Sequence, residues 1–182
     1  MDGIQLAAPG EPIIGFNQPQ VLSSVDLFEN PQRPLGKSAV VIDDVGHYEA
    51  VAAAEYLLNK GLSVTFVTTQ MSFAPRSQPA FMAVPALRRM LPKGLKLMVR
   101  TRVLEITRDS VIVVPADIAT GSNCREEVRA DCVVFVSLNR PDTDLVPDLH
   151  AAGVKVTLIG DALSPRFLPT AMREGRLAGL AA

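Results

Sequence analysis

The turn after the apolar run at residues 39–42 is where this sequence could bind a phosphate. A strand-to-helix turn holds the pyrophosphate of a dinucleotide when it carries the pattern G-x-G-x-x-G. The glycines let backbone N–H groups at the helix N-terminus reach the phosphates. Aligned by its strand and helix, the turn has Asp43, Val45 and Tyr48 at the three glycine positions, and Gly46 lies one position away. The glycine fingerprint is therefore missing.

Acidic residues at the same turn oppose a bound diphosphate. Asp43 and Asp44 precede the helix, and Glu49 lies in its first turn. Carboxylates near a helix N-terminus stabilise it by about 0.5–1 kcal/mol each, because they accept hydrogen bonds from free N–H groups and complement the helix dipole. The same charges repel phosphate. We therefore expect the aspartates to cap the helix rather than to belong to a nucleotide site.

The other half of a dinucleotide site would lie at the end of the next strand. NAD-specific sites place an acidic residue there to bind the ribose hydroxyls, and NADP-specific sites use a nearby arginine. The sequence has Thr68, Thr69 and Gln70 at this place, and Arg76 follows in what we expect to be a solvated loop. Both halves of the dinucleotide fingerprint are therefore absent.

The remaining reactive side chains form no recognised catalytic set. His47 stands alone in a first helical turn, and His150 has Asp148 two residues before it, a spacing that does not share a helical face. The patterns G-x-S-x-G and C-x-x-C are both missing. The two cysteines, Cys124 and Cys132, are too few for a disulfide framework or a four-ligand metal site. We expect no catalytic residue and no metal site in this chain.

Composition excludes several classes of function. The 182 residues are 48% hydrophobic and 20% charged, which suits one globular domain or one domain with a fragment of another. With 18 basic and 19 acidic residues there is no excess of positive charge for nucleic acid, and Arg88–Arg89 and Arg100–Arg102 are expected to be solvated. No apolar run reaches the roughly 20 residues of a membrane span. The start shows no signal-peptide pattern, so we expect a cytoplasmic protein with reduced thiols.

Hydrophobic periodicity supplies the elements that would position these residues. The strand at residues 39–42, a helix over 47–60 ended by Gly61 and a strand over 63–67 form a parallel βαβ unit. The pattern continues as a helix over 80–91 with Pro85 inside it, then strands at 96–99, 103–107, 110–114 and 129–136. It ends with a helix over 145–152, a strand over 154–159 and a helix over 169–180. This order predicts an α/β fold, a Rossmann-like parallel sheet with helices on both faces, an antiparallel β-meander and a terminal strand–helix. We expect residues 39–42 at the centre of the sheet.

The first 36 residues differ in composition from the rest of the chain. Prolines and glycines interrupt every possible element there, at Pro9, Gly10, Pro12, Gly15, Pro19, Pro31, Pro34 and Gly36. Such a segment is either a connector that starts within a larger protein or a floppy tail.

Motifs near the end of the chain resemble one enzyme family. Residues 156–166 and 171–176 read VTLIGDALSPR and AMREGR. They resemble the closing "IGD…APR…A…GhrAG" pattern of the trimethylamine dehydrogenase and 2,4-dienoyl-CoA reductase group of NADH:flavin oxidoreductases. Three further segments resemble this group in the same order along the chain: PIIGF with VLS at 12–16 and 21–23, IDDVGHY at 42–48, and FVSLNRPD at 135–142. The turn at 42–48 is most similar to the amine-dehydrogenase members.

The resemblance implies that this chain is the C-terminal, dinucleotide-binding-like part of a flavoprotein oxidoreductase. The family has a TIM barrel with FMN, an iron–sulfur (4Fe-4S) cluster, and an FAD-like domain into which an NAD(P)-binding-like domain is inserted. The family's catalytic residues lie in the parts that this chain lacks. The resemblance assigns cofactor contacts to Gly160, Asp161 and Ala162, whose pocket holds FAD or, in the amine-dehydrogenase members, ADP. The isolated chain is then expected to bind no cofactor and to be inactive.

The resemblance also implies a division of the chain. Residues 1–36 would be a connector, residues 37–138 the NAD(P)-binding-like Rossmann domain with its meander, and residues 139–182 the terminal strand–helix of the FAD- or ADP-binding-like domain. Its partners would be the barrel and the FAD-like half of the same protein, and the sequence leaves open whether the protein forms a homo-oligomer.

The alternative is a free-standing α/β module that binds a partner protein without a cofactor. A free NAD(P)-binding subunit is a third reading, which the missing glycines disfavour. Substrate and redox partner are not specified by these residues.

Overall fold

The structure, a computed structural model, describes residue 5, residues 12–117 and residues 124–181. The chain divides into two compact units, Met1–Ser137 and Leu138–Ala182, which are described separately below.

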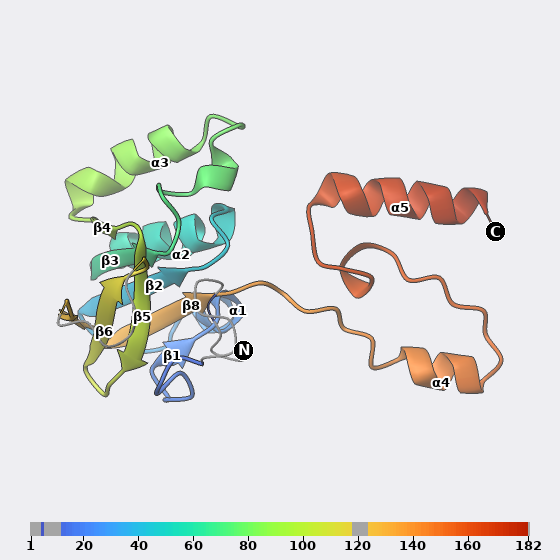
Figure 1. The fold of residues 1–182 in the computed structure, drawn as a ribbon, viewed down its shortest axis with the longest axis horizontal. Coiled ribbons are helices and arrows are strands. Elements are labelled where there is room, and N and C mark those ends of the chain that lie inside the picture. Colours follow the sequence, from blue (N-terminus) through green and yellow to red (C-terminus); the bar gives the residue numbers. More distant parts are fainter. Residues whose placement is uncertain (1–4, 6–11, 118–123, 182) are drawn as a thin grey trace. The chain divides into compact units, whose positions relative to one another are not determined.

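A five-stranded parallel sheet forms the centre of the first unit (Figure 1). Its order is β1 (Val21–Leu22), β8 (Cys132–Val136), β2 (Ser38–Asp43), β3 (Ser63–Thr68) and β4 (Lys96–Met98), and all neighbouring strands are parallel. Strand β2 lies in the middle because its residues are apolar on both faces and buried. The prediction that residues 39–42 are central is confirmed.

Three helices pack on one face of this sheet. They are α1 (Ser24–Glu29), α2 (Tyr48–Asn59) and α3 (Ala83–Met90). The alanine-rich inner face of α2 packs closely on the strands, and Leu57 is fully buried against Val41 and Phe66 in one core cluster. The βαβ unit predicted around residue 50 is confirmed. Pro85 is the third residue of α3, where a missing N–H costs no intrahelical bond.

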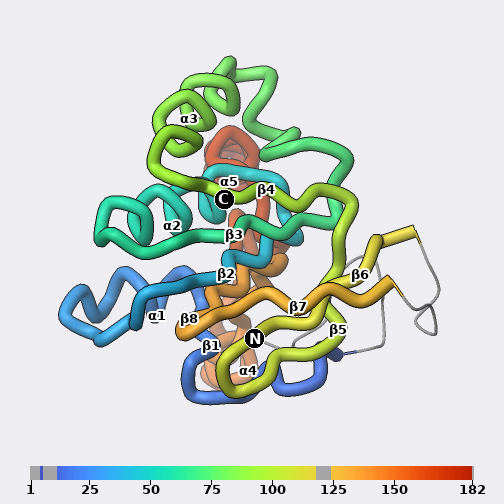
Figure 2. Tube along the Cα trace, turned by 90° about the vertical axis from the view of Figure 1, so that its left-hand side faces the viewer, coloured from blue at the N-terminus to red at the C-terminus, as the bar shows by residue number. Residues whose placement is uncertain are grey.

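An antiparallel sheet covers the other face. It has the order β5 (Thr101–Ile106), β6 (Ser110–Pro115) and β7 (Glu126–Arg129), with a bulge between Val103 and Glu105. A second core cluster fills the space between the sheets, with Val40, Ile42, Val67, Val111 and Phe135 among its members. Figure 2 shows the helices on one side of the parallel strands and the meander on the other. The α/β fold with a meander is confirmed, but helices cover one face of the sheet rather than both.

The predicted single strand over residues 129–136 is two strands in different sheets. Strand β7 ends at Arg129 and β8 begins at Cys132, so the chain crosses between the sheets at Ala130 and Asp131. The Asp131 carboxylate fixes this crossing, because it accepts hydrogen bonds from the backbone N–H groups of Lys37 (2.8 Å) and Ser38 (3.0 Å). The sequence concealed the crossing, since no turn residue such as glycine or proline separates the exposed strand β7 from the buried strand β8.

The N-terminal segment contains more regular structure than its prolines suggest. Strand β1 and helix α1 both lie before residue 37, and Ser23 forms a capping box with Asp26 at the start of α1. Ile14 pairs with β5 through a hydrogen bond from Ile106 N–H to its carbonyl (2.7 Å). Gln5 acts as a further partner for this strand, because its side chain bonds both the N–H and the carbonyl of Val103.

The second unit contains helices α4 (Val146–Ala151) and α5 (Leu168–Leu180) with a 3-10 turn, η3 (Gly160–Ala162), between them. The predicted helices are confirmed. The predicted strand at 154–159 is wrong for this structure, because the described part of the unit offers no second strand to pair with it. None of the described residues of this unit is buried, and many large apolar side chains are exposed, among them Leu145, Val154, Leu163, Phe167, Leu168, Met172, Leu177 and Leu180.

Across the described residues, every helix is too short or too polar to span a bilayer.

Candidate functional site

The carboxyl edge of the parallel sheet is the place where open α/β folds bind ligands. Asp43, Thr68 and Val136 end three adjacent strands here and lie in register with one another. The turn after β2 and the loop after β3 therefore meet at this edge, as the sequence pattern required.

Asp43 is the best-buried carboxylate of this edge, with only 1% of its surface exposed. Its Oδ1 accepts hydrogen bonds from the N–H groups of Val45 (3.1 Å) and Gly46 (2.8 Å). Its Oδ2 is buried without a hydrogen-bond partner among the described residues. Burial raises the pKa of Asp43 from 3.8 to about 6, although the two N–H groups partly offset that rise. The two N–H groups of this turn are thus already bound to a carboxylate.

The aspartates do not cap helix α2, so that expectation is wrong. The N-cap residue is His47, and its side chain makes no capping hydrogen bond. Asp43 binds the turn before the helix instead, and Asp44 accepts from the Thr69 hydroxyl (3.2 Å) while its N–H donates to the Val136 carbonyl (3.0 Å). The turn is long enough that both carboxylates are engaged before the helix begins.

The loop after β3 covers the turn after β2. Gly46 has φ +75°, and its carbonyl accepts a hydrogen bond from Arg76 N–H (2.9 Å). A Cβ atom at Gly46 would lie 3.1 Å from Cγ and Cδ of Pro75 and 3.5 Å from Cγ of Gln70. The side chains of Pro75 and Gln70 therefore lie close to the backbone of the turn at Gly46.

This covering loop is held in place by its own buried residues. Phe73 packs on Phe66 of β3 with ring centroids 5.0 Å apart, and Ala74 is fully buried with a left-handed φ of +43°. The 3-10 turn Pro75–Ser77 follows at once. Because Phe73 and Ala74 belong to the main core cluster, the loop is part of the folded domain rather than a detachable cover.

The other residues singled out at this edge have local partners. The Tyr48 hydroxyl donates to Sδ of Met82 (2.8 Å), and the Thr68 hydroxyl accepts from Gln70 N–H (3.2 Å). The pKa of His47 is lowered by burial and by the positive charge of Arg76. The side chain of Arg76 is exposed, as expected for a loop residue, but its backbone closes the turn.

In the second unit, Gly160, Asp161 and Ala162 together form the turn η3. Gly160 has φ +59°, and its N–H donates to Oε2 of Glu174 on α5 (2.8 Å). Arg166 forms an ion pair with the other oxygen of Glu174. Asp161 is exposed. Sequence reasoning did not single out Arg166 or Glu174, although both stand inside the motifs at 156–166 and 171–176.

Comparison with known proteins identifies relatives of this fold. No protein-family model and no curated protein matches the chain. Among solved structures, 6-hydroxypseudooxynicotine amine oxidase from Pseudomonas geniculata N1 superimposes with a TM-score of 0.87 at 30% identity, over 98% of this chain and 26% of the enzyme. In fold and in sequence, the chain thus resembles a part of an enzyme of the trimethylamine dehydrogenase group of NADH:flavin oxidoreductases. The resemblance deduced from the motifs is confirmed.

Two further structures share the fold. Histamine dehydrogenase from Rhizobium sp. 4-9 has a TM-score of 0.84 at 24% identity, over 98% of this chain and 28% of the enzyme. 2-Naphthoyl-CoA reductase has a TM-score of 0.75 at 22% identity, over 93% of this chain and 24% of the enzyme. The chain therefore spans about a quarter of the length of each relative. Its α/β fold is of the Rossmann- or FAD-like type and is shared with a part of these enzymes.

The histidine and cysteine candidates from the sequence lie in ordinary exposed or buried positions. His150 and Asp148 are exposed on α4. Cys132 is buried on β8, where burial raises the pKa of its thiol to about 11, and Cys124 is exposed. Among the described residues, no three His, Cys, Asp or Glu side chains are grouped so that they could hold a metal ion.

The two basic clusters are partly paired rather than only solvated. Arg89 binds Glu55 through two nitrogens, at 2.6 and 2.9 Å, and Arg100 binds Asp117 at 2.6 Å. Arg102 is buried. Arg89 and Arg100 are therefore used in ion pairs within the fold.

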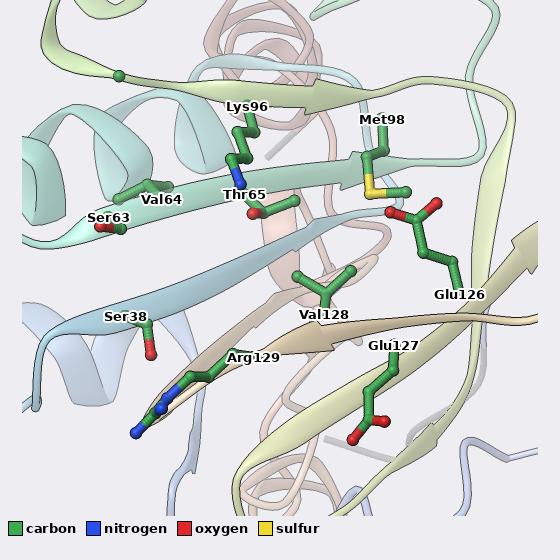
Figure 3. Close-up of a pocket in the computed structure, with 11 residues that line it drawn as sticks. Ser38, Ser63, Val64, Thr65, Lys96, Met98, Glu126, Glu127, Val128 and Arg129 are labelled. Carbon is green, nitrogen blue, oxygen red and sulfur yellow. The ribbon is translucent and has the colours of Figure 1, made fainter.

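A separate pocket of about 440 Å³ opens at the opposite, amino edge of the parallel strands (Figure 3). Its walls come from the starts of β2, β3 and β4 and from β7. Sequence reasoning missed this pocket because it depends on how two sheets diverge, and a strand pattern carries no signal for that separation.

Proposed function

We propose that this chain is the dinucleotide-binding-like region of a flavin-dependent oxidoreductase of the trimethylamine dehydrogenase group, and that its NAD(P) site no longer binds a nucleotide. In this proposal the chain positions other parts of the parent enzyme, and the catalytic groups lie in those parts. The 30% identity to an amine oxidase over almost the whole chain supports the family assignment. It also makes an amine-oxidising parent the favoured choice over an enone reductase.

The observation that carries the proposal is the filled turn after β2. Oδ1 of Asp43 takes the two N–H groups of Val45 and Gly46, and Pro75 lies against the α-carbon of Gly46. A pyrophosphate would have to displace both a buried carboxylate and a proline ring. The residues present therefore do not fit NAD(H) or NADP(H) at this edge.

For the second unit, we propose that Gly160, Asp161 and Ala162 contact FAD or ADP in the parent protein. The exposed Asp161 carboxylate has the chemistry to accept hydrogen bonds from ribose or ribityl hydroxyls. Glu174 supports this role because it fixes Gly160 N–H and Arg166 on either side of the turn. A bound flavin would supply hydride and electron transfer, while these residues would orient it. FMN and a 4Fe-4S cluster would belong to other parts of the parent.

The partner of the second unit is proposed to be the FAD-like half of the same protein. Its exposed leucines, Phe167 and Met172 form more apolar surface than a small free module normally leaves in water. This observation favours a parent protein that covers the unit over the alternative of a free-standing module.

Calorimetric titration of the 182-residue chain with NADH and NADPH tests the proposal. We expect dissociation constants no better than about 1 mM, equivalent to about −4 kcal/mol, and a purified chain without flavin colour. Replacing Asp43, Val45 and Tyr48 by glycine frees the N–H groups of the turn, and adding Pro75→Gly opens the space above them. Affinity should rise more with four changes than with three. Micromolar NADH binding by the native chain would overturn the proposal.

A further inference from the structure

The amino-edge pocket has a floor that belongs to the core and a rim that is open to water. It lies where the parallel and antiparallel sheets separate, beyond the second core cluster. Thr65 of β3 is buried at the floor, and its hydroxyl forms no hydrogen bond with any described residue. Val64, Met98 and Val128 add apolar surface to the same walls. A volume of about 440 Å³ lies within the range of small-molecule sites.

Two cations lie on one side of this pocket. Lys96 of β4 extends toward Thr65, and Arg129 of β7 extends toward Ser38 at the start of β2 (Figure 3). Neither cation has a carboxylate partner within ion-pair distance among the described residues, whereas Arg89, Arg100 and Arg166 all do. The Asp131 carboxylate accepts hydrogen bonds from Lys37 and Ser38 and attracts the charge of Arg129, but it forms no ion pair with Arg129.

A carboxylate lies at the other side. The side chain of Glu126 reaches the side of Met98, away from Arg129, while Glu127 points out of the pocket (Figure 3). Glu127 also accepts a hydrogen bond from the Ser110 hydroxyl (2.7 Å), so its charge is engaged. Glu126 has no ion pair within the described part of the chain. The pocket is therefore cationic at one end, apolar in the middle and anionic at the other end.

We propose that this amino-edge pocket binds a small organic zwitterion, with its anionic group at Lys96 and Arg129 and its ammonium group at Glu126. The apolar part of the ligand lies over Met98 and Val128, and the Thr65 hydroxyl donates to the anionic group. The site is on the opposite edge of the sheet from the filled nucleotide turn. It is independent of the proposed flavoprotein role, because it needs neither a dinucleotide nor another part of a parent enzyme.

The test uses the full chain and 6-aminohexanoate, with hexanoate and hexylamine as probes that each lack one charge. Amide chemical shifts are followed at millimolar probe concentrations. We expect shifts at β4 and β7 that saturate with 6-aminohexanoate, and an affinity about fivefold higher than for either single-charge probe, since each partly exposed charge pair contributes about 1 kcal/mol. Lys96→Met and Arg129→Gln should each remove that advantage, and Glu126→Gln should reduce 6-aminohexanoate to the affinity of hexanoate.

Matched variants outside the pocket separate charge at the site from charge on the surface. Lys155→Met and Arg88→Gln remove exposed cations elsewhere, and we expect both to bind 6-aminohexanoate like the native chain. Circular dichroism confirms that each variant is folded. Absence of saturable shifts in the native chain would overturn the proposal, as would equal losses in the pocket variants and the matched variants. A failure here leaves the NADH titration unaffected, so the two proposals are tested separately.

Discussion

Asp43 is engaged in the turn after β2, and its burial places a cost on the fold. Its Oδ1 accepts hydrogen bonds from two turn N–H groups, but Oδ2 has no hydrogen-bond partner in the described structure. A buried carboxylate with one unsatisfied oxygen is held away from water at the expense of stability. The residue therefore makes the stability of the fold depend on pH.

At the residue scale, we predict that Asp43→Asn stabilises the chain above pH 7. The folded-state pKa is raised from 3.8 to about 6, so the folded state holds the proton more tightly than the unfolded state. The contribution of the protonated carboxyl to the free energy of unfolding is complete below pH 4. It is lost as the pH rises to 6 and above, which lowers the free energy of unfolding by about 2–3 kcal/mol. The amide keeps the Oδ1 acceptor without the charge. Urea unfolding at pH 8 should show the gain, which should vanish near pH 4.

Asp142→Asn is the control for that measurement, because Asp142 is exposed in the second unit. It should leave the free energy of unfolding unchanged at both pH values. If Asp43→Asn loses the same stability at pH 4 and pH 8, the buried NH2 group of the new asparagine, rather than the charge of the aspartate, dominates at this site.

At the element scale, two loops interlock at the carboxyl edge. The turn after β2 offers a glycine in the left-handed region, and the loop after β3 lays Pro75 against it. Because the loop is fixed by Phe73 and Ala74, neither element can move without disturbing the core. The interlock explains why glycine is needed at 46 even though the phosphate fingerprint is gone.

We predict that Gly46→Ala destabilises the chain more than Gly61→Ala. Both glycines have positive φ, +75° and +86°, so both substitutions carry the strain of a left-handed side chain, about 1 kcal/mol. Only at Gly46 does the new Cβ meet other atoms, Cγ and Cδ of Pro75 at 3.1 Å, whereas Gly61 faces open space. The contact should add about 1–2 kcal/mol. Thermal unfolding of both variants measures the difference.

A double-mutant cycle isolates the contact. Adding Pro75→Ala removes the two ring atoms, so Gly46→Ala should cost no more than Gly61→Ala in that background. An equal cost of Gly46→Ala with and without Pro75 would mean that the proline does not cover the turn in solution.

Elements with strong local signals were predictable, and those set by distant contacts were not. The apolar run of β2 and the alternation of β5 and β6 carry their own pattern, so their places were predicted correctly. The crossing at Ala130 and Asp131 depends on a carboxylate that bonds Lys37 and Ser38, about ninety residues away. The strand expected at 154–159 needs a neighbouring strand, which no local pattern supplies.

The candidate site also combines features that the sequence shows with features that depend on contacts between distant residues. The missing glycines and the acidic turn were visible in the sequence, and the prediction of a degenerate nucleotide site that rests on them stays a prediction. The cover by Pro75 and the bond from Arg76 N–H to Gly46 were not visible, because they join residues of different loops. Helix capping by Asp43 was predicted wrongly, since the sequence does not show where the turn ends and the helix begins.

At the scale of the whole molecule, stability is concentrated in one unit. Met1–Ser137 contains two core clusters, whereas no described residue of Leu138–Ala182 is buried. Apolar burial is the main source of folding free energy, so the second unit has little of its own. Its order depends on local links such as the one from Glu174 to Gly160 and Arg166.

We predict that a leucine-to-alanine substitution lowers the free energy of unfolding strongly in the first unit and hardly at all in the second. Leu57→Ala in α2 removes a fully buried side chain and should lower the free energy of unfolding by about 2–5 kcal/mol. Leu168→Ala in α5 removes a side chain that is 73% exposed and should change it by less than about 0.5 kcal/mol. Hydrogen exchange of the native chain should agree, with amides of α5 exchanging at least about 1,000-fold faster than those of β2. Equal losses for both leucines, together with strong protection of α5, would show that the second unit is covered in the isolated chain.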